Sequence, residues 1–113
     1  MAEPTVTNIS DRKPKRYKIG VDGVQAGLAA YVDTATQRIF YHTETSDDFA
    51  GQGLASKLVA AALADTRASG KRIVAICPFV AAYVDKHDDF DDILDPVTPQ
   101  ARAVVRAELA DDA

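Results

Sequence analysis

Four side chains with the chemistry for proton transfer or acyl transfer lie at two points of the chain. His42 and Glu44 are close together in the segment RIFYHTET, and both residue types accept a proton near neutral pH when placed beside a substrate. Cys77 directly precedes Pro78, and Tyr83 follows shortly after. A cysteine at the start of a helix favours the thiolate form and is then a nucleophile, whereas a free cysteine elsewhere usually packs as a small apolar residue. Each side chain also has a structural interpretation: an exposed strand carboxylate, a structural histidine, a buried thiol and a packed aromatic ring.

A glycine-containing turn between these two points favours anion binding. Gly51 and Gly53 lie where an extended segment gives way to a helical one, so the backbone there bends tightly. The amides of residues 52–57 then lie at a helix N-terminus, where phosphate groups bind. Lys57 either adds a charge contact or is solvated. The alternative is a plain loop, and the spacing fits neither a P-loop nor a Rossmann fingerprint, which needs a glycine or alanine where Ser56 stands.

Composition predicts one globular domain and excludes several classes of protein. The chain has 113 residues, 47% of them hydrophobic, and no apolar run approaches the length of a membrane span. A formal net charge of −4 argues against a general nucleic-acid binder. With one cysteine and no secretory signal, a cytoplasmic location is expected. The one basic cluster, Arg12, Lys13, Lys15 and Arg16, is interpreted as a solvated tail or as a contact for an anionic partner.

The elements that position these residues follow from hydrophobic periodicity. Alternation predicts that Ile39, Tyr41 and Thr43 share one face of a strand, and that Phe40, His42 and Glu44 share the other. Asp22-Gly23 predicts a hairpin turn, and Thr98-Pro99 a helix start. The acidic residues 88–96 are expected to be irregular. The expected strands span 17–21, 24–32, 38–45 and 73–77, and the expected helices span 54–69, 78–87 and 99–110.

This order of elements predicts an α+β fold. Three antiparallel strands come first, and the strand at 73–77 is expected to be parallel to its neighbour because a helical crossover precedes it. The sheet is therefore mostly antiparallel with one parallel join, and helices pack on it. Residues 1–14 are expected to be a flexible tail, residues 15–95 the domain, and residues 96–113 a C-terminal helical extension.

Three blocks of sequence, in this order, resemble the GNAT superfamily of acetyl-CoA-dependent N-acetyltransferases, and more closely its small NATD-type branch. The blocks are HTE at residues 42–44, GQGLASKLV at 51–59 and CPFVAAY at 77–83. The resemblance covers about residues 17–94. In the superfamily pattern an arginine or glutamine precedes the glycines, and Ala50 stands there in this chain. The two helices that usually follow the first strand are also absent, since only a turn separates Val21 from Val24.

The resemblance implies a GNAT-like fold, acetyl-CoA as co-substrate, an amine as acceptor and no metal. It places the pyrophosphate at the glycine turn, the pantetheine arm along Thr43–Thr45 and the acetyl group near Cys77. Direct attack by the amine is expected, with Glu44 or His42 as base and Tyr83 protonating the departing thiolate. The residues thus assigned to coenzyme binding are Thr43, Glu44, Thr45, Gly51, Gln52, Gly53, Leu54, Ala55, Ser56, Lys57, Cys77, Pro78, Phe79 and Tyr83.

Two other functions are compatible with the sequence. One is a non-catalytic acyl-CoA-binding or sensor module, which the small size and Ala50 favour. The other is a scaffold that binds a partner through the C-terminal helix and the basic cluster. A metal site built from His42, Cys77, His87 and the acidic segment is not expected, because no pair of these residues has a recognised ligand spacing.

Overall fold

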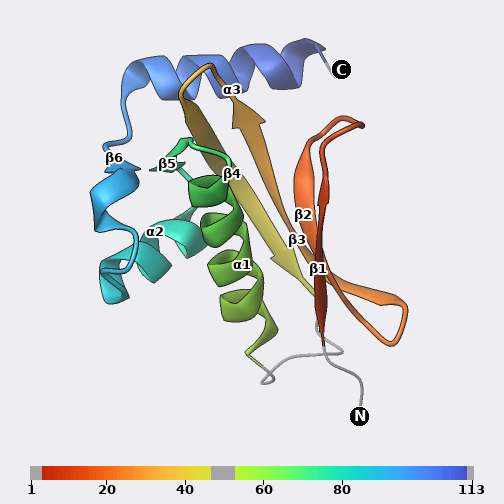
Figure 1. Ribbon diagram of the computed structural model, residues 1–113. Helices are drawn as coiled ribbons and strands as arrows, with labels where there is room; N and C mark the ends of the chain where they lie inside the picture. The colour runs from red at the N-terminus through yellow and green to blue at the C-terminus, as the bar shows by residue number, and fades with distance from the viewer. Residues whose placement is uncertain (1–3, 47–52, 112–113) are drawn as a thin grey trace.

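The computed structural model describes residues 4–46 and 53–111, and within them six strands form one mixed sheet with three α-helices packed on it (Figure 1). Most of these elements agree with the sequence prediction to within two residues. The strands are β1 (Thr5–Ile9), β2 (Arg16–Val21), β3 (Val24–Asp33), β4 (Gln37–Thr45), β5 (Arg72–Ala75) and β6 (Leu94–Asp95), and the helices are α1 (Leu54–Ala68), α2 (Pro78–Lys86), the 3-10 helix η2 (Asp91–Ile93) and α3 (Pro99–Asp111).

The strands lie in the sheet in the order in which they occur along the chain. Strands β1 to β4 are antiparallel, and the Asp22-Gly23 turn between β2 and β3 has positive φ angles of 54° and 81°, as a tight hairpin requires. Strand β5 is parallel to β4, because α1 crosses over between them. The predicted α+β fold with its parallel join is therefore confirmed. The two-residue strand β6 adds a second parallel pairing, to β5, within the acidic segment that was expected to be irregular.

The N-terminal segment differs from the expected flexible tail. Strand β1 pairs with β2 from Thr5 opposite Gly20 to Ile9 opposite Arg16. Asn8 accepts a 2.6 Å hydrogen bond from the Tyr31 hydroxyl, and Val6 packs against the core. The segment is too polar to predict a strand by itself, and the neighbouring strand supplies the hydrogen bonds that order it.

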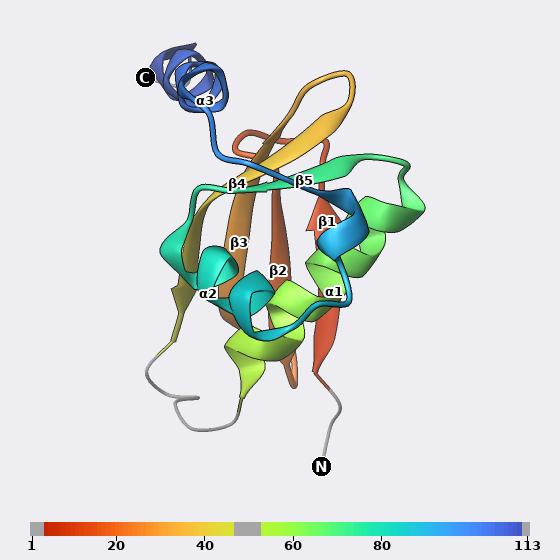
Figure 2. The same cartoon turned by 90° about the vertical axis from the view of Figure 1, so that its left-hand side faces the viewer.

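The two faces of the sheet are covered by different helices (Figure 2). Helices α1 and α2 lie on one face, where Leu58, Leu63 and Val80 are at most 1% exposed in the larger apolar cluster. Helix α3 lies on the other face, where Ala101 and Val105 pack against residues of β3, β4 and β5. We call these the α1/α2 face and the α3 face.

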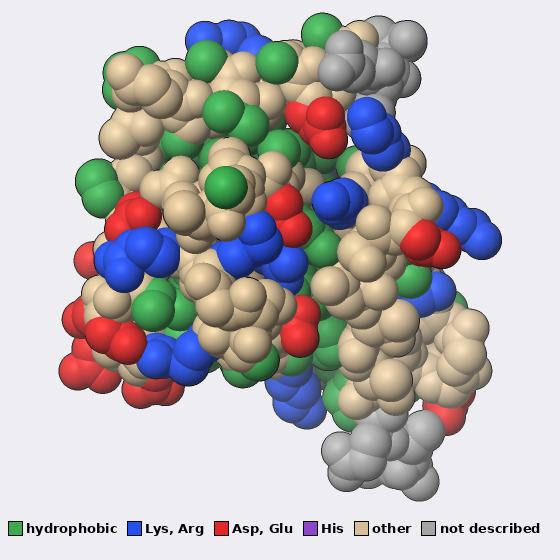
Figure 3. Space-filling model, turned by 45° about the horizontal axis from the view of Figure 1, so that its top comes forward, with side chains coloured by type: hydrophobic (Ala, Val, Ile, Leu, Met, Phe, Trp, Pro, Cys, Tyr) green, Lys and Arg blue, Asp and Glu red, His purple; other side chains and the backbone are tan. Residues whose placement is uncertain are grey.

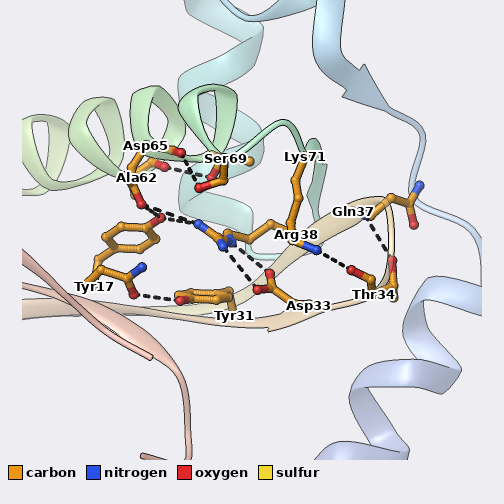
Figure 4. Close-up of polar contacts among 12 residues, drawn as sticks. Tyr17, Tyr31, Asp33, Thr34, Gln37, Arg38, Ala62, Asp65, Ser69 and Lys71 are labelled. Atoms are coloured by element: carbon orange, nitrogen blue, oxygen red, sulfur yellow. Dashed lines mark hydrogen bonds and ion pairs between the residues drawn. The ribbon is translucent and has the colours of Figure 1, made fainter. Parts of the chain in front are cut away.

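A buried arginine network holds four of these elements together at one end of the α1/α2 face (Figure 4). The Arg38 side chain is 7% exposed and donates to both carboxylate oxygens of Asp33, at 2.8 and 3.1 Å. It also donates to the Tyr17 hydroxyl and lies 4.6 Å from the centre of the Tyr31 ring. The Tyr17 hydroxyl in turn donates to Asp65 on α1 at 2.6 Å. Burial raises the pKa of Tyr17, and the hydrogen bond to Asp65 raises it further.

Two arginines hold the acidic segment against the rest of the domain. Arg67 on α1 donates to both carboxylate oxygens of Asp92 at 2.7 Å and to the carbonyl oxygen of Asp89 at 2.7 Å. Arg72 at the start of β5 donates to Asp95 at 2.6 Å. In Figure 3 acidic side chains gather on the left of the molecule, with basic side chains between them. This segment is therefore held to the domain both by charge pairing and by apolar burial, since Phe90 is 9% exposed in the larger apolar cluster and Ile93 and Leu94 pack against it.

Candidate functional site

Strands β4 and β5 diverge beyond Phe40. Their parallel pairing runs from Gln37 opposite Arg72 to Phe40 opposite Ala75. The carbonyl oxygen of Phe40 then accepts hydrogen bonds from the amides of both Ile76 and Cys77, at 3.0 and 2.9 Å, and the chain turns away into α2. Within the part of the chain that the structure describes, residues 42–45 of β4 pair with β3 alone. The far edge of this part of β4 is therefore open to an extended ligand that hydrogen-bonds to backbone groups.

A β-bulge in β4 changes which side chains reach this opening. His42 pairs with Ala30 and Phe40 with Tyr31, so Tyr41 is the extra, bulged residue at this point of β4. The expectation that Phe40, His42 and Glu44 share one face is therefore wrong. Thr43 lies on the α1/α2 face with Phe40, and His42 and Glu44 lie on the α3 face. A bulge shifts the alternation of side chains by one residue, and this accounts for the difference.

Thr43 and Cys77 meet across the opening. The Thr43 hydroxyl oxygen is 3.1 Å from the Cys77 sulfur, and either atom can donate the hydrogen bond. Cys77 is 4% exposed, belongs to the larger apolar cluster and caps the N-terminus of α2 through its backbone. Pro78 occupies the first position of that helix, as predicted. The thiol therefore faces the divergence of β4 and β5 with a hydroxyl beside it.

His42 and Glu44 form a pair on the opposite face of β4. The His42 Nε2 atom lies 3.4 Å from a Glu44 carboxylate oxygen, and the two side chains are 54% and 62% exposed. Both groups are in contact with solvent and with each other. They are suited to act on a substrate that reaches β4 from the α3 face.

The first turn of α1 offers backbone amides to an anion. Gly53 has a φ of 69° and a ψ of 19°, a left-handed conformation that favours glycine, and it has no side chain with which to cap the turn. Leu54 and Leu58 are buried and fix the helix on the core, whereas Ser56 and Lys57 are exposed. The Leu54 side chain is therefore packed in the core and is not presented to a ligand. The predicted residues Gly51 and Gln52, and Ala50 before them, lie outside the described residues.

A pocket of about 120 Å³ lies between this turn and α2. Tyr83 and His87 stack in it with ring centres 4.3 Å apart, and Phe79 is 41% exposed at its edge. Their spacing of four residues on and just after α2 places these three rings along one pocket. Lys86 also lines the pocket, although the sequence analysis did not select it; its position three residues after Tyr83 was the available signal. The residues that line the pocket are Ser56, Phe79, Ala82, Tyr83, Lys86 and His87.

A comparison with protein-family models agrees with this geometry. The model described as GCN5-related N-acetyl-transferase matches residues 16–93, which is more than half of the chain. The chain belongs to the GCN5-related N-acetyltransferase family. A search of curated proteins found no match. The matched region of this acetyltransferase-family domain runs from β2 to η2, so β1 and α3 lie outside it.

The acetyltransferase-family fold thus brings the predicted site residues together in three groups. Thr43 and Cys77 meet at the divergence of β4 and β5, Ser56 joins the rings of α2, and His42 pairs with Glu44 on the other face. Across residues 4–46 and 53–111, no cluster of three or more His, Cys, Asp or Glu side chains has the arrangement of a metal site. In the same part of the chain, no helix is both long and apolar enough to cross a membrane.

Proposed function

We propose that this protein transfers the acetyl group of acetyl-CoA to an amine by direct attack. The observation that carries the proposal is the edge of β4 at residues 42–45, which has no partner strand among the described residues on the side of Cys77 and the start of α2. An extended pantetheine arm fits such an edge, because its amide groups can complete the hydrogen bonds that β5 no longer makes. Membership of the acetyltransferase family supports the same reaction class.

The charged end of the coenzyme fits the first turn of α1. Its uncapped amides carry a partial positive charge of about half a unit, and Lys57 adds a full charge in the same turn. Ser56 connects this turn to the pocket of α2, where Lys86 supplies a second cation. The pyrophosphate is thus assigned to the amides of Gly53–Ser56, with the Lys57 side chain beside them because its amide already donates to the carbonyl oxygen of Gly53, and the pantetheine arm to Thr43–Thr45.

Acetyl-CoA supplies an activated acetyl group as a thioester. Cys77, Pro78 and Phe79 are proposed to line the site of that group, with Cys77 acting as a packed thiol rather than a nucleophile. Glu44, with His42 beside it, removes the proton of the amine, since both groups lie on the face from which an acceptor can approach β4 freely. The amine nitrogen forms the new C–N bond, the thioester C–S bond breaks, and Tyr83 is assigned to protonate the departing thiolate.

Isothermal titration with CoA and acetyl-CoA tests the binding half of the proposal. Replacing Lys57 by glutamine should weaken binding about threefold to tenfold and reduce its salt dependence, because one exposed charge contact to phosphate is lost. Arg102→Gln on α3 removes the same charge far from the turn and should leave the dissociation constant unchanged. Failure of either ligand to bind would refute the proposal.

Thiol release across a panel of amines tests the catalytic half. We expect turnover with at least one amine. If the His42–Glu44 pair is the base, the double variant His42→Gln/Glu44→Gln should turn over at least about a hundredfold more slowly. Saturable acetyl-CoA binding without turnover would instead identify the non-catalytic acyl-CoA-binding alternative.

A further inference from the structure

The α3 face of the sheet is covered by α3 only in part. Ala101 and Val105 of the helix pack on Val32, Ile39 and Val74. The rest of this face lies along β1 to β4. Its residues Lys18, Ala30 and Glu44 belong to neither apolar cluster. This remainder is the surface on which His42 and Glu44 lie.

The strand register aligns side chains across this surface in rows. Lys18 pairs with Leu28, and Leu28 pairs with Glu44, so these three residues form one row across β2, β3 and β4. Arg16, Ala30 and His42 form the next row in the same way. Tyr17 and Ile19 point into the opposite core, which places the alternating β2 residues on the α3 face. We call these six residues the β2–β4 trough.

The trough has charged side chains along its β2 and β4 sides and shorter apolar side chains on β3 between them. Its β2 side carries the cations Arg16 and Lys18, and its β4 side carries Glu44 with His42. Leu28 and Ala30 lie between them on β3, and Ala30 is 3% exposed. The two sides are two strand spacings apart, or about 10 Å between backbones.

Two hollows lie beside the row formed by Lys18, Leu28 and Glu44. One, of about 300 Å³, is lined by Lys18 and by Thr5, Thr7 and Gln25 among others. The other, of about 210 Å³, is lined by Leu28, Glu44 and Gln25. Gln25 lines both hollows, so the two lie next to each other on this face.

The charged side chains of the trough differ in whether they have a partner within the protein. Glu44 is paired with His42, and Arg16 donates to the carbonyl oxygen of Pro14 at 2.8 Å. For the Lys18 ammonium group, no hydrogen bond or ion pair is found with any part of the chain that the structure describes. Within the described residues, Lys18 is therefore the trough cation left to receive an anionic group, and the Asp22 carboxylate lines the same hollow.

We propose that the β2–β4 trough binds the acceptor, and that the acceptor is a small amine that also carries an anionic group. The placement of the amine at Glu44 rests on the proposed acetyl transfer. The anionic group binds at Lys18, and a short apolar chain between the two groups lies over Leu28. An acceptor of this type satisfies both sides, whereas a plain alkylamine leaves Lys18 without a partner.

Titration of the ¹⁵N-labelled protein with aminohexanoate and with hexylamine tests this directly, because the two probes differ only in the carboxylate. Aminohexanoate should shift the amide signals of Lys18, Leu28 and Glu44 and should bind about fivefold more tightly than hexylamine, the effect of one partly exposed ion pair. Lys18→Gln should abolish this difference, whereas Arg102→Gln should preserve it. An aminoalkyl phosphate of the same length shows whether a phosphate serves better than a carboxylate.

The outcomes separate this proposal from the proposed function. Equal binding of the two probes, or signal shifts confined to other faces, would overturn the trough as an acceptor site even if the enzyme acetylates both amines. Selective binding of aminohexanoate in the trough without any acetyl transfer would leave the trough in place and refute the enzymatic function. The spectra also report whether each variant is folded.

Discussion

The role of Cys77 is decided by its replacement with alanine. If the thiol only lines the acetyl site, the change removes one buried group from the apolar cluster and leaves the chemistry in place. We expect kcat to fall by less than about tenfold, since direct attack needs no acceptor group at this position. If the thiol instead takes up the acetyl group, its loss should lower kcat by roughly a thousandfold or more.

The structure also sets the expected loss of stability. The Cys77 side chain is almost fully buried and makes one polar contact, to Thr43 at 3.1 Å. Burial of a sulfur-sized group and one modest hydrogen bond together contribute about 1–2 kcal/mol to the free energy of unfolding. The melting temperature of Cys77→Ala should therefore fall by about 5–10 °C. Thr43→Val keeps the shape, removes the hydroxyl partner and should cost about half as much.

Steady-state thiol release and thermal unfolding measure the two effects on the same samples. Cys77→Ser is the matched control, because serine keeps a hydrogen bond to Thr43 but is a far poorer nucleophile. Intact-mass spectrometry of the protein after rapid mixing with acetyl-CoA adds a direct test. An acetylated Cys77 that forms and disappears at the rate of turnover, together with a thousandfold loss in both variants, would refute direct attack.

Three further predictions concern stability, pH and the leaving group. Arg38→Met should lower the free energy of unfolding by about 3–5 kcal/mol in urea titrations, because it leaves the Asp33 carboxylate without its partner in a largely buried site; a loss below about 1 kcal/mol would contradict this. The hydrogen bond from Gln37, with the nearby Arg72, holds the pKa of Asp95 below its ordinary value. The ionised Asp95 therefore stabilises the fold at any pH above its ordinary pKa, and this stabilisation is lost as the pH falls through the lowered pKa of the folded state. Unfolding at pH 2–5 should therefore show a shallower acid dependence in Asp95→Asn, and an unchanged slope would show that Asp95 contributes nothing. Tyr83→Phe should lower kcat about tenfold or more with little change in acetyl-CoA affinity, and an unchanged kcat with a good amine would exclude Tyr83 as the proton donor.

Local signals predicted most elements of the fold. Gly53 and Gly70 bound α1 within one or two residues, because glycine supplies the left-handed conformations at both ends, with φ angles of 69° and 75°. Pro78 predicted the start of α2 for a similarly local reason. Strand β1 was missed because its order comes from β2 and from the Tyr31 hydroxyl, which are distant in sequence. A single-sequence pattern contains no information on such a pairing.

The candidate site was predicted by residue type but not by geometry. Nothing in RIFYHTET marks Tyr41 as the bulged residue, since every residue there is compatible with a regular strand. The bulge depends on how β4 pairs with β3, and it reverses the faces of His42, Thr43 and Glu44. The contact between Thr43 and Cys77 spans 34 residues of sequence and follows from the same reversal.

The bulge also has a chemical consequence for Cys77. In a regular strand, His42 and Glu44 would share the face of Phe40 and lie toward the thiol, which would give Cys77 an adjacent base and would bring two charged groups toward an apolar cluster. With Tyr41 bulged, the thiol meets a threonine hydroxyl, which is a poor base at neutral pH. The base pair instead lies on the α3 face, where an amine can reach it and where the trough begins. The same register shift thus leaves a threonine hydroxyl rather than a base beside Cys77 and puts the His42–Glu44 pair on the face open to an incoming amine, which supports the proposal of direct attack.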